Sequence, residues 1–235
     1  MLIPFQNIEL ERVYTQTLAG KVRSLAITSA NAGEGVTTLA TALAHRNLMA
    51  GRSTLLVDLN LWNPSLNGVL DLDTAIEEKG LLPSPRLISS GSQSDALIGI
   101  TAPTKRDAVL KLREPGVLEQ CIEEWHKDYD TVIIDTSPIN RVNARNIPAE
   151  RVAAACDAAI LSVLAGMTSE TMVSSAVKKL NEAGALLLGS VINDRFNPSL
   201  KDELLREIRR ISRLRPLARW LSNKVQGMRL LSLEV

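Results

Sequence analysis

Short apolar runs alternate with amphipathic stretches along most of the chain. Residues 24–29 and 53–60 are nearly continuous apolar runs of strand length, and the second has the composition of a parallel strand that is covered on both faces. Between them, a small Gly-containing turn at residues 31–35 leads into a helical stretch at residues 36–50. The first 60 residues therefore predict a strand, a loop, a helix and a second strand.

The same alternation continues as far as residue 193. Further strands are expected at residues 96–101, 131–135, 158–163 and 186–193, and further helices at residues 116–126 and 169–183. Strands that alternate with helices indicate right-handed crossovers, and so an α/β fold with a doubly wound, mostly parallel sheet and helices on both faces. Ligands bind such sheets at the carboxyl ends of the strands. Residues 66–93 have no sustained period, and the sequence leaves short helices or a mobile loop open there.

Composition places the chain among ordinary globular proteins. It has 235 residues, of which 45% are hydrophobic and 23% are charged, which is enough for one sizeable core. The net charge of +1 gives no reason to expect a nucleic-acid partner. No window reaches the ~18 consecutive apolar residues of a spanning helix, and Glu9 and Glu11 interrupt the start of the chain, so no signal peptide is expected. A cytoplasmic protein is predicted.

The segment that carries chemistry is TSANAGEGVTT at residues 28–38, between the first strand and the first helix. A phosphate-binding loop needs small residues, so that successive backbone N–H groups converge on the phosphate oxygens beside a helix amino end. Gly33 and Gly35 suit that role, and a plain tight turn from strand to helix is the alternative. Thr37 stands where a hydroxyl coordinates Mg²⁺ in such loops, and Thr38 where a second hydroxyl reaches a phosphate. Val36, however, replaces the lysine, and valine cannot donate to a phosphate.

Four motifs in order resemble P-loop ATPases of the MinD and ParA type, and most closely the cytoplasmic bacterial tyrosine kinases of polysaccharide export. Residues 29–38 match a loop similar to Ser-x-x-Pro-Gly-Glu-Gly-Lys-Ser-Thr, without its Lys and Pro and with Thr for Ser. Residues 58–64 (DLNLWNP) correspond to Asp-x-Asp-Leu-Arg-x-Pro. Residues 129–138 (YDTVIIDTSP) match Tyr-Asp-x-Val-Ile-Ile-Asp-Thr-Pro-Pro almost completely. Residues 189–193 (GSVIN) resemble a strand end whose Asn reads the adenine edge.

The resemblance implies a P-loop NTPase fold and a site for ATP or ADP with Mg²⁺. The implied nucleotide contacts are Ala32, Gly33, Glu34, Gly35, Val36, Thr37, Thr38 and Asn193. Asp58 and Asp135 would be catalytic, with Thr37 and Asp135 as the metal ligands. The residues alone leave other roles open: the two Asp as helix caps or turn acids, and Asn193 as an Asx-turn residue.

Departures from the family pattern predict impaired catalysis. Phosphoryl transfer depends on cations that neutralise charge on the transferred group, yet Val36 replaces the lysine, Asn60 the second acid and Trp62 the arginine. One charge-assisted hydrogen bond contributes ~1.5–3 kcal/mol, so nucleotide should bind roughly tenfold to a hundredfold more weakly. The kinase family also autophosphorylates a tyrosine-rich carboxyl tail, and the tail of this chain contains no Tyr. Tyrosine kinase activity is not expected.

Three functional hypotheses follow. In the first, the protein is a catalytically impaired scaffold or regulator in envelope exopolysaccharide biosynthesis. In the second, it is an active MinD/ParA-like ATPase switch for spatial positioning that works as a nucleotide-sandwiched homodimer, with the cation supplied by Lys21, Arg23 or a partner subunit. In the third, it is an interaction module that uses no nucleotide.

The basic charge gathers at the end of the chain. Residues 200–235 hold nine Lys or Arg against four Asp or Glu, whereas the preceding residues hold eighteen against twenty-two. We expect an NTPase-like domain at residues 1–199 and a basic amphipathic helical tail at 200–235 as part of the same domain. The tail is either an ordinary surface helix or a dock for an anionic membrane surface or the cytoplasmic end of a membrane polysaccharide-export protein.

Overall fold

The computed structural model describes residues 7–64, 66, 81–89, 96–141, 143 and 146–195. The chain divides into two compact units, Met1–Asn193 and Asp194–Val235, and the fold described below is that of the first unit. Its helices are α1 (Ile8–Gln16), α2 (Val36–Met49), α3 (Arg106–Leu112), α4 (Val117–Trp125), α5 (Ala149–Ala155) and α6 (Glu170–Glu182). Its strands are β1 (Ser24–Ser29), β2 (Thr54–Leu59), β3 (Arg86–Ser89), β4 (Ala96–Ile100), β5 (Thr131–Thr136), β6 (Ala158–Leu164) and β7 (Leu187–Asn193).

These strands form one sheet in the order β3-β4-β2-β5-β1-β6-β7. Every neighbouring pair is parallel except β3 and β4, which are antiparallel. The prediction of a doubly wound, mostly parallel sheet is confirmed. β3 lies within residues 66–93, where the sequence left only short helices or a loop open. The strand was missed because a four-residue edge strand is too short to show a period.

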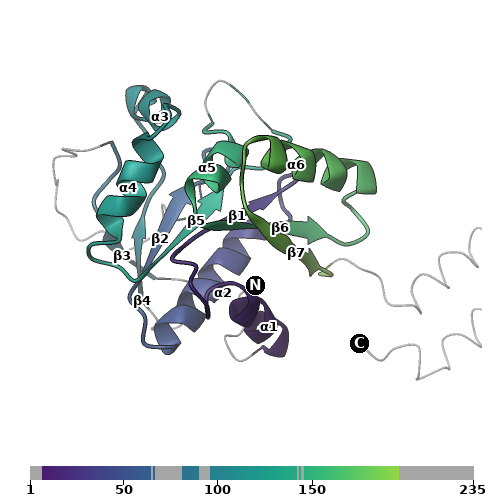
Figure 1. Ribbon diagram of the computed structural model, residues 1–235, viewed down its shortest axis with the longest axis horizontal. Helices are drawn as coiled ribbons and strands as arrows, with labels where there is room; N and C mark the ends of the chain where they lie inside the picture. Colours follow the sequence, from purple (N-terminus) through teal and green to yellow (C-terminus); the bar gives the residue numbers. More distant parts are fainter. Residues whose placement is uncertain are drawn as a thin grey trace, which may run out of the picture. The chain divides into compact units, whose positions relative to one another are not determined.

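Helices cover both faces of the sheet, as Figure 1 shows. On one face, α1 and α2 pack against alternate residues of the central strands: Leu25, Ile27, Leu56 and Ile133. On the other face, α3, α4, α5 and α6 pack against the intervening residues: Ala26, Leu55, Val57, Val132 and Ile134. Because both faces are covered, every residue of β1, β2 and β5 is buried, as their continuous apolar sequences predicted.

Helix α1 was not predicted, and its formation has a local and a tertiary cause. The Asn7 side chain accepts hydrogen bonds from the backbone N–H groups of Glu9, at 2.7 Å, and Leu10, which caps the first turn. Leu10 and Tyr14, four residues apart, form the buried stripe of the helix. The Arg46 guanidinium of α2 lies 4.2 Å from the centre of the Tyr14 ring, which holds α1 against α2.

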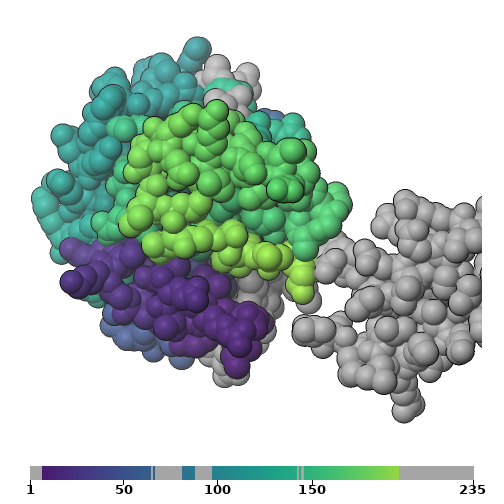
Figure 2. All heavy atoms as spheres, turned by 45° about the vertical axis from the view of Figure 1, so that its right-hand side comes forward, coloured from purple at the N-terminus to yellow at the C-terminus, as the bar shows by residue number. Residues whose placement is uncertain are grey.

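β7 is an edge strand with an exposed surface. In Figure 2 it is the light-green band between α6 above and α1, in purple, below. Its Leu188 and Ile192 side chains are 41% and 69% exposed. In the described part of the chain, no helix is both long and apolar enough to cross a bilayer. The expected tail at residues 200–235 lies outside the described residues, and the boundary at residue 199 stays a prediction.

Candidate nucleotide-binding site

The predicted site residues meet at the carboxyl ends of four strands. β1 leads into the loop at residues 30–35, here called the P-loop, and its neighbour β5 carries Asp135 near its end. Asp58 of β2 is the direct register partner of Asp135. On the other side, β6 connects β1 to β7, which ends at Asn193. Residues from four separate segments therefore lie along one edge of the sheet, where ligands of such sheets bind.

Two glycines give the P-loop its shape. Gly33 and Gly35 have φ angles of 84° and 93°, in the left-handed region that other residues adopt only with strain. Gly35 is also the N-cap of the 14-residue helix α2, and no side chain caps that helix end. The first backbone N–H groups of α2 lie at the positive dipole end of the helix. This arrangement suits an anion.

Glu34 is turned into the protein rather than toward the loop opening. Its side chain is 2% exposed, and its carboxylate accepts hydrogen bonds from the Ala30 backbone N–H at 3.0 Å and the Thr168 hydroxyl at 2.6 Å. The Asn31 amide donates to the same carboxylate at 3.3 Å. The carboxylate thus fixes the shape of the loop, and any contact of Glu34 with phosphate is left to its backbone. Ala32, at the tip of the loop, is exposed.

Two distant strands hold the loop from the side. The Ser162 hydroxyl of β6 and the Asn193 amide of β7 both donate to the Glu34 backbone oxygen, at 2.6 and 3.2 Å. A Cβ atom on Gly35 would lie only 2.5 Å from the Asn193 amide nitrogen, so only glycine fits there as the side chain stands. Asn193, which the resemblance gave a base-reading role, is here packed on the P-loop backbone. Its contact with an adenine stays a prediction.

The two residues expected to hold Mg²⁺ are in contact. The Thr37 hydroxyl donates to Asp135 Oδ2 at 2.5 Å, while Asp135 Oδ1 is buried and forms no hydrogen bond of normal geometry. Burial, and to a lesser extent the charge of Asp58, raise the pKa of Asp135 to about 8, although Thr37 and Asn60 lower it. Asp135 thus offers a buried carboxylate next to the Thr37 hydroxyl. These are oxygen ligands of the kind that Mg²⁺ prefers.

Asp58 is already engaged by backbone groups. It is fully buried, and its two oxygens accept hydrogen bonds from the N–H groups of Asn60, at 2.8 Å, and Leu66, at 3.1 Å. Asp58 therefore does act as a turn acid, the alternative role that its sequence position left open. Its charge also acts on Asp135, so the structural and electrostatic roles coexist.

The position of the loop lysine is apolar in space as well as in sequence. Val36 is 7% exposed and packs in the cluster between α2 and the sheet, together with Leu39 and Leu43. Arg23 does not replace the missing charge. It precedes β1 and lies at the amino ends of the strands, where its guanidinium donates to the carbonyls of His126 and Asp130. Six residues of strand, about 20 Å, separate that edge from the P-loop.

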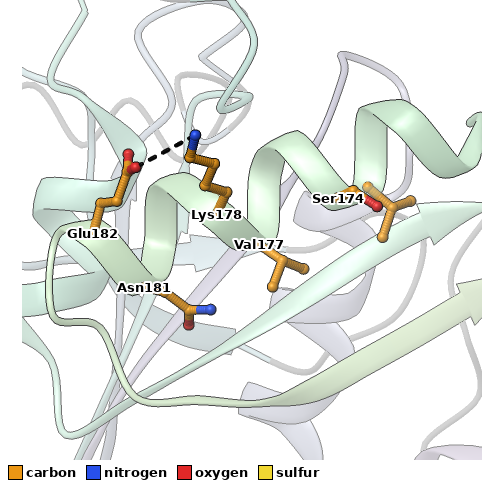
Figure 3. A pocket seen from close by; sticks show the side chains of 6 residues that line it. Ser174, Val177, Lys178, Asn181 and Glu182 are labelled. Atoms are coloured by element: carbon orange, nitrogen blue, oxygen red, sulfur yellow. Dashed lines mark ion pairs between the residues drawn. The ribbon is translucent and has the colours of Figure 1, made fainter.

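A surface hollow of about 430 Å³ lies elsewhere, along the outer side of α6. Figure 3 shows Ser174, Val177 and Asn181 along it and the ion pair between Lys178 and Glu182, whose atoms are 3.8 Å apart. An exposed pair of this kind adds little stability. None of these residues hydrogen-bonds to the P-loop, so this hollow is separate from the site at the strand ends.

The described residues fit a nucleoside phosphate with Mg²⁺ in all but one respect. The start of α2 and the two positive-φ glycines suit phosphate, and Thr37 with the buried Asp135 carboxylate suits the metal. The lysine is missing.

Sequence reasoning missed Ser162 and Thr168, which support the loop, because nothing near them in sequence connects them with a segment more than a hundred residues away.

A P-loop at the end of β1, with an acid at the end of the adjacent β5, defines a P-loop α/β protein of the MinD type. No protein-family model matches the chain. Tyrosine-protein kinase CpsD of Streptococcus agalactiae is 30% identical over 178 residues, which are 72% of this chain and 74% of CpsD. CpsD of Streptococcus pneumoniae is 29% identical over 184 residues, which are 76% and 78% of the two chains. The chain belongs to this family of bacterial tyrosine-protein kinases.

Solved structures agree on the fold. The chimerical protein CapA2B2 has a TM-score of 0.61 at 23% identity, with 81% of this chain and 85% of that chain covered. The septum site-determining protein MinD of Pyrococcus horikoshii, solved with Mg-ADP, has a TM-score of 0.54 at 22% identity, with 74% and 71% covered. The recognition made from four motifs is confirmed.

Proposed function

We propose that this protein is a catalytically impaired member of the kinase family that serves as a scaffold or regulator in envelope exopolysaccharide biosynthesis. The observation that carries the proposal is Val36, a buried aliphatic side chain where the family has its phosphate-binding lysine. Asn60, in place of the second acid, supports it. Phosphoryl transfer needs cations at the transferred group. An aliphatic side chain packed between α2 and the sheet supplies none.

Weak nucleotide binding is part of the proposal, because most of the phosphate cradle does not depend on lysine. The backbone N–H groups of residues 33–37 would bind the phosphates, and Thr37 and Asp135 would hold Mg²⁺. A bound ATP would supply the transferable phosphate. Because the pKa of Asp135 is about 8, the carboxyl holds a proton at neutral pH and has to release it when a cation binds. Metal binding should therefore strengthen as the pH rises toward 8.

The proposed pathway and partner rest on the similarity to these kinases. CpsD is named as a tyrosine-protein kinase, and the four motifs resemble the kinases of polysaccharide export. We place the cytoplasmic end of a membrane export protein, or an anionic membrane surface, as the partner of the basic tail at residues 200–235. Localisation at the cytoplasmic side of the membrane follows from that partner.

The first test measures ATP turnover. Purified wild-type protein should hydrolyse ATP no faster than an Asp135→Ala control and should transfer no phosphate to its own tyrosines. Val36→Lys should raise ATP affinity on the order of tenfold to a hundredfold, since it adds one charge-assisted hydrogen bond. Turnover should appear only when Asn60→Asp is added to Val36→Lys.

The alternative of an active ATPase switch predicts the opposite result. Wild-type turnover that rises with protein concentration and disappears in Asp135→Ala would indicate a cation supplied by a second copy, and would replace the proposal. A thermal melt of each variant checks that lost activity does not reflect unfolding.

A further inference from the structure

We infer that Arg141, stacked on Trp62, is the residue that contacts the terminal phosphate of a bound nucleoside triphosphate, in place of the missing loop lysine. This inference rests on the proposed nucleotide binding. It concerns the regulation of the same site, because a contact of this kind distinguishes ATP from ADP without requiring hydrolysis.

The backbone places Arg141 beside the P-loop. After β5 the chain crosses the end of β1, where the Ile139 N–H donates to the Ser29 oxygen at 2.9 Å. The Asn140 N–H donates to the oxygen of Ala30, the first P-loop residue, at 3.1 Å. Ile139 is fully buried, which anchors this crossing in the core. Arg141 is the next residue, so its backbone is held one residue away from the start of the P-loop.

The side chain of Arg141 reaches the segment that follows β2. Its guanidinium carbon lies 5.6 Å from the centre of the Trp62 ring, and Trp62 follows β2, four residues after Asp58. β5, which carries Asp135, lies between β1 and β2 in the sheet, so the pair formed by Arg141 and Trp62 lies at the same edge of the sheet as Asp135. Within the described part of the chain, the guanidinium has neither a hydrogen bond nor an ion pair, and Arg141 is exposed.

The charges around this edge favour such a role. Asp58 and Asp135 are buried there, and no cation replaces the lysine in the P-loop. Lys179 of α6 is occupied by the Ile139 oxygen and the Asn140 side chain, and Arg23 lies at the far edge of the sheet. Among the described residues that approach the crossing, Arg141 has its donors available.

Arg141 together with Trp62 can replace the arginine of the kinase motif. The kinase motif has an arginine where this chain has Trp62, and Arg141 brings a guanidinium back to the same place from another segment. A guanidinium can stack on an aromatic ring with its face while its edge donates two parallel hydrogen bonds to a phosphate. Trp62, which is 44% exposed, is thus a support that orients Arg141. Trp62 is a positioning residue in this scheme.

The test is a binding titration with Mg²⁺ and fluorescently labelled ATP and ADP on the full chain. Arg141→Ala should weaken ATP binding about tenfold to a hundredfold, the loss of one charge-assisted contact, and ADP binding less than about threefold. Arg141→Lys should restore part of the ATP affinity. Arg86→Ala, an exposed arginine on the far strand β3, is the matched control and should change neither affinity.

Two further readouts separate a phosphate contact from a structural role. The tryptophan emission of the wild type should change on addition of ATP, and the change should be lost in Arg141→Ala. The emission of Trp62→Phe gives the contribution of Trp125 and Trp220 to the signal. In a Val36→Lys background, the loop lysine should compensate, so Arg141→Ala should cost less ATP affinity than it does in the wild type.

Equal weakening of ATP and ADP, or unchanged ATP affinity, would overturn the inference. Failure of the native chain to bind ATP would overturn it as well. None of these outcomes overturns the scaffold role, which fails only if the wild type turns over ATP. A native chain that binds no ATP would also overturn the weak nucleotide binding that is proposed with that role. Arg141 is exposed, so its removal should leave the melting temperature unchanged.

Discussion

Individual side chains decide what this site can do. The pKa of Asp135 is raised to about 8, because its carboxyl is buried beside a second buried acid, Asp58. A lysine in the P-loop would offset both acids, and Val36 does not. The loss of one cation therefore affects the protonation of the acid that remains, as well as the phosphate contact.

Asp135 should make folding stability depend on pH. Its pKa is raised from 3.8 to about 8 in the folded protein, so its contribution is fully present below pH 4 and decreases as the pH rises to 8. Asp135→Asn removes this dependence. Relative to the wild type, it should gain about 1.4 kcal/mol of unfolding free energy for each pH unit in that window. Urea unfolding at pH 5, 6.5 and 8 measures the difference.

A stability difference between wild type and Asp135→Asn that stays constant across these pH values would contradict the assigned pKa. Asp130→Asn is a suitable control. Hydrogen bonds from Ser53 lower the pKa of this exposed acid, so the effect of Asp130→Asn should change with pH only in the acidic range and with the opposite sign, and should be constant between pH 5 and 8.

At the scale of elements, a loop is held by strands that are distant in sequence. β6 and β7 each place one side chain on the Glu34 carbonyl, and the turn after β6 places Thr168 on the Glu34 carboxylate. The edge strand β7 is therefore coupled to the P-loop, although its other side faces solvent. A ligand that shifts the loop would act directly on Asn193.

The contact between Gly35 and Asn193 can be tested by a double-mutant cycle. Gly35→Ala should destabilise more than Gly33→Ala. Both force a non-glycine residue to a positive φ, which costs roughly 1–2 kcal/mol, but only the first places a Cβ against the Asn193 amide. In an Asn193→Ala background the extra cost of Gly35→Ala should fall by about 0.5–1 kcal/mol. Equal costs in the two backgrounds would indicate that the amide moves aside freely.

For the whole molecule, the distribution of charge along the chain matters more than the net charge. The net charge is +1, yet residues 200–235 carry nine basic against four acidic side chains, and the rest of the chain is slightly acidic. A basic segment of this kind favours contact with an anionic surface. This is the basis for the proposed partner.

The full-length protein should therefore cosediment with vesicles that contain anionic lipid, and not with vesicles of neutral lipid. Binding should weaken as the salt concentration is raised from about 50 to about 300 mM. Each basic residue contributes ~1 kcal/mol near the lipid, and salt screens this attraction. Arg209→Glu with Arg210→Glu should abolish it. If anionic vesicles capture nothing at low salt, the tail does not dock directly to lipid, and a protein partner remains.

Much of the fold could be predicted from the sequence because its signals are local. Six of the seven strands follow from apolar runs, and the P-loop with its helix follows from Gly33, Gly35 and the spacing to Thr37. The short helices α3 and α5, of seven residues each, escaped prediction because two turns are too few to establish a period. The missing lysine and the missing second acid are likewise visible in the sequence alone.

Only the tertiary structure decided which residues of these motifs meet. The strand order brings Asp58 and Asp135 into register although they are 77 positions apart in the sequence. It turns the Glu34 carboxylate inward to Thr168, lays Asn193 against Gly35, and sets Arg141 over Trp62. These contacts join elements through the packing of one sheet edge, and hydrophobic periodicity, which reports only the faces of single elements, carries no information about them.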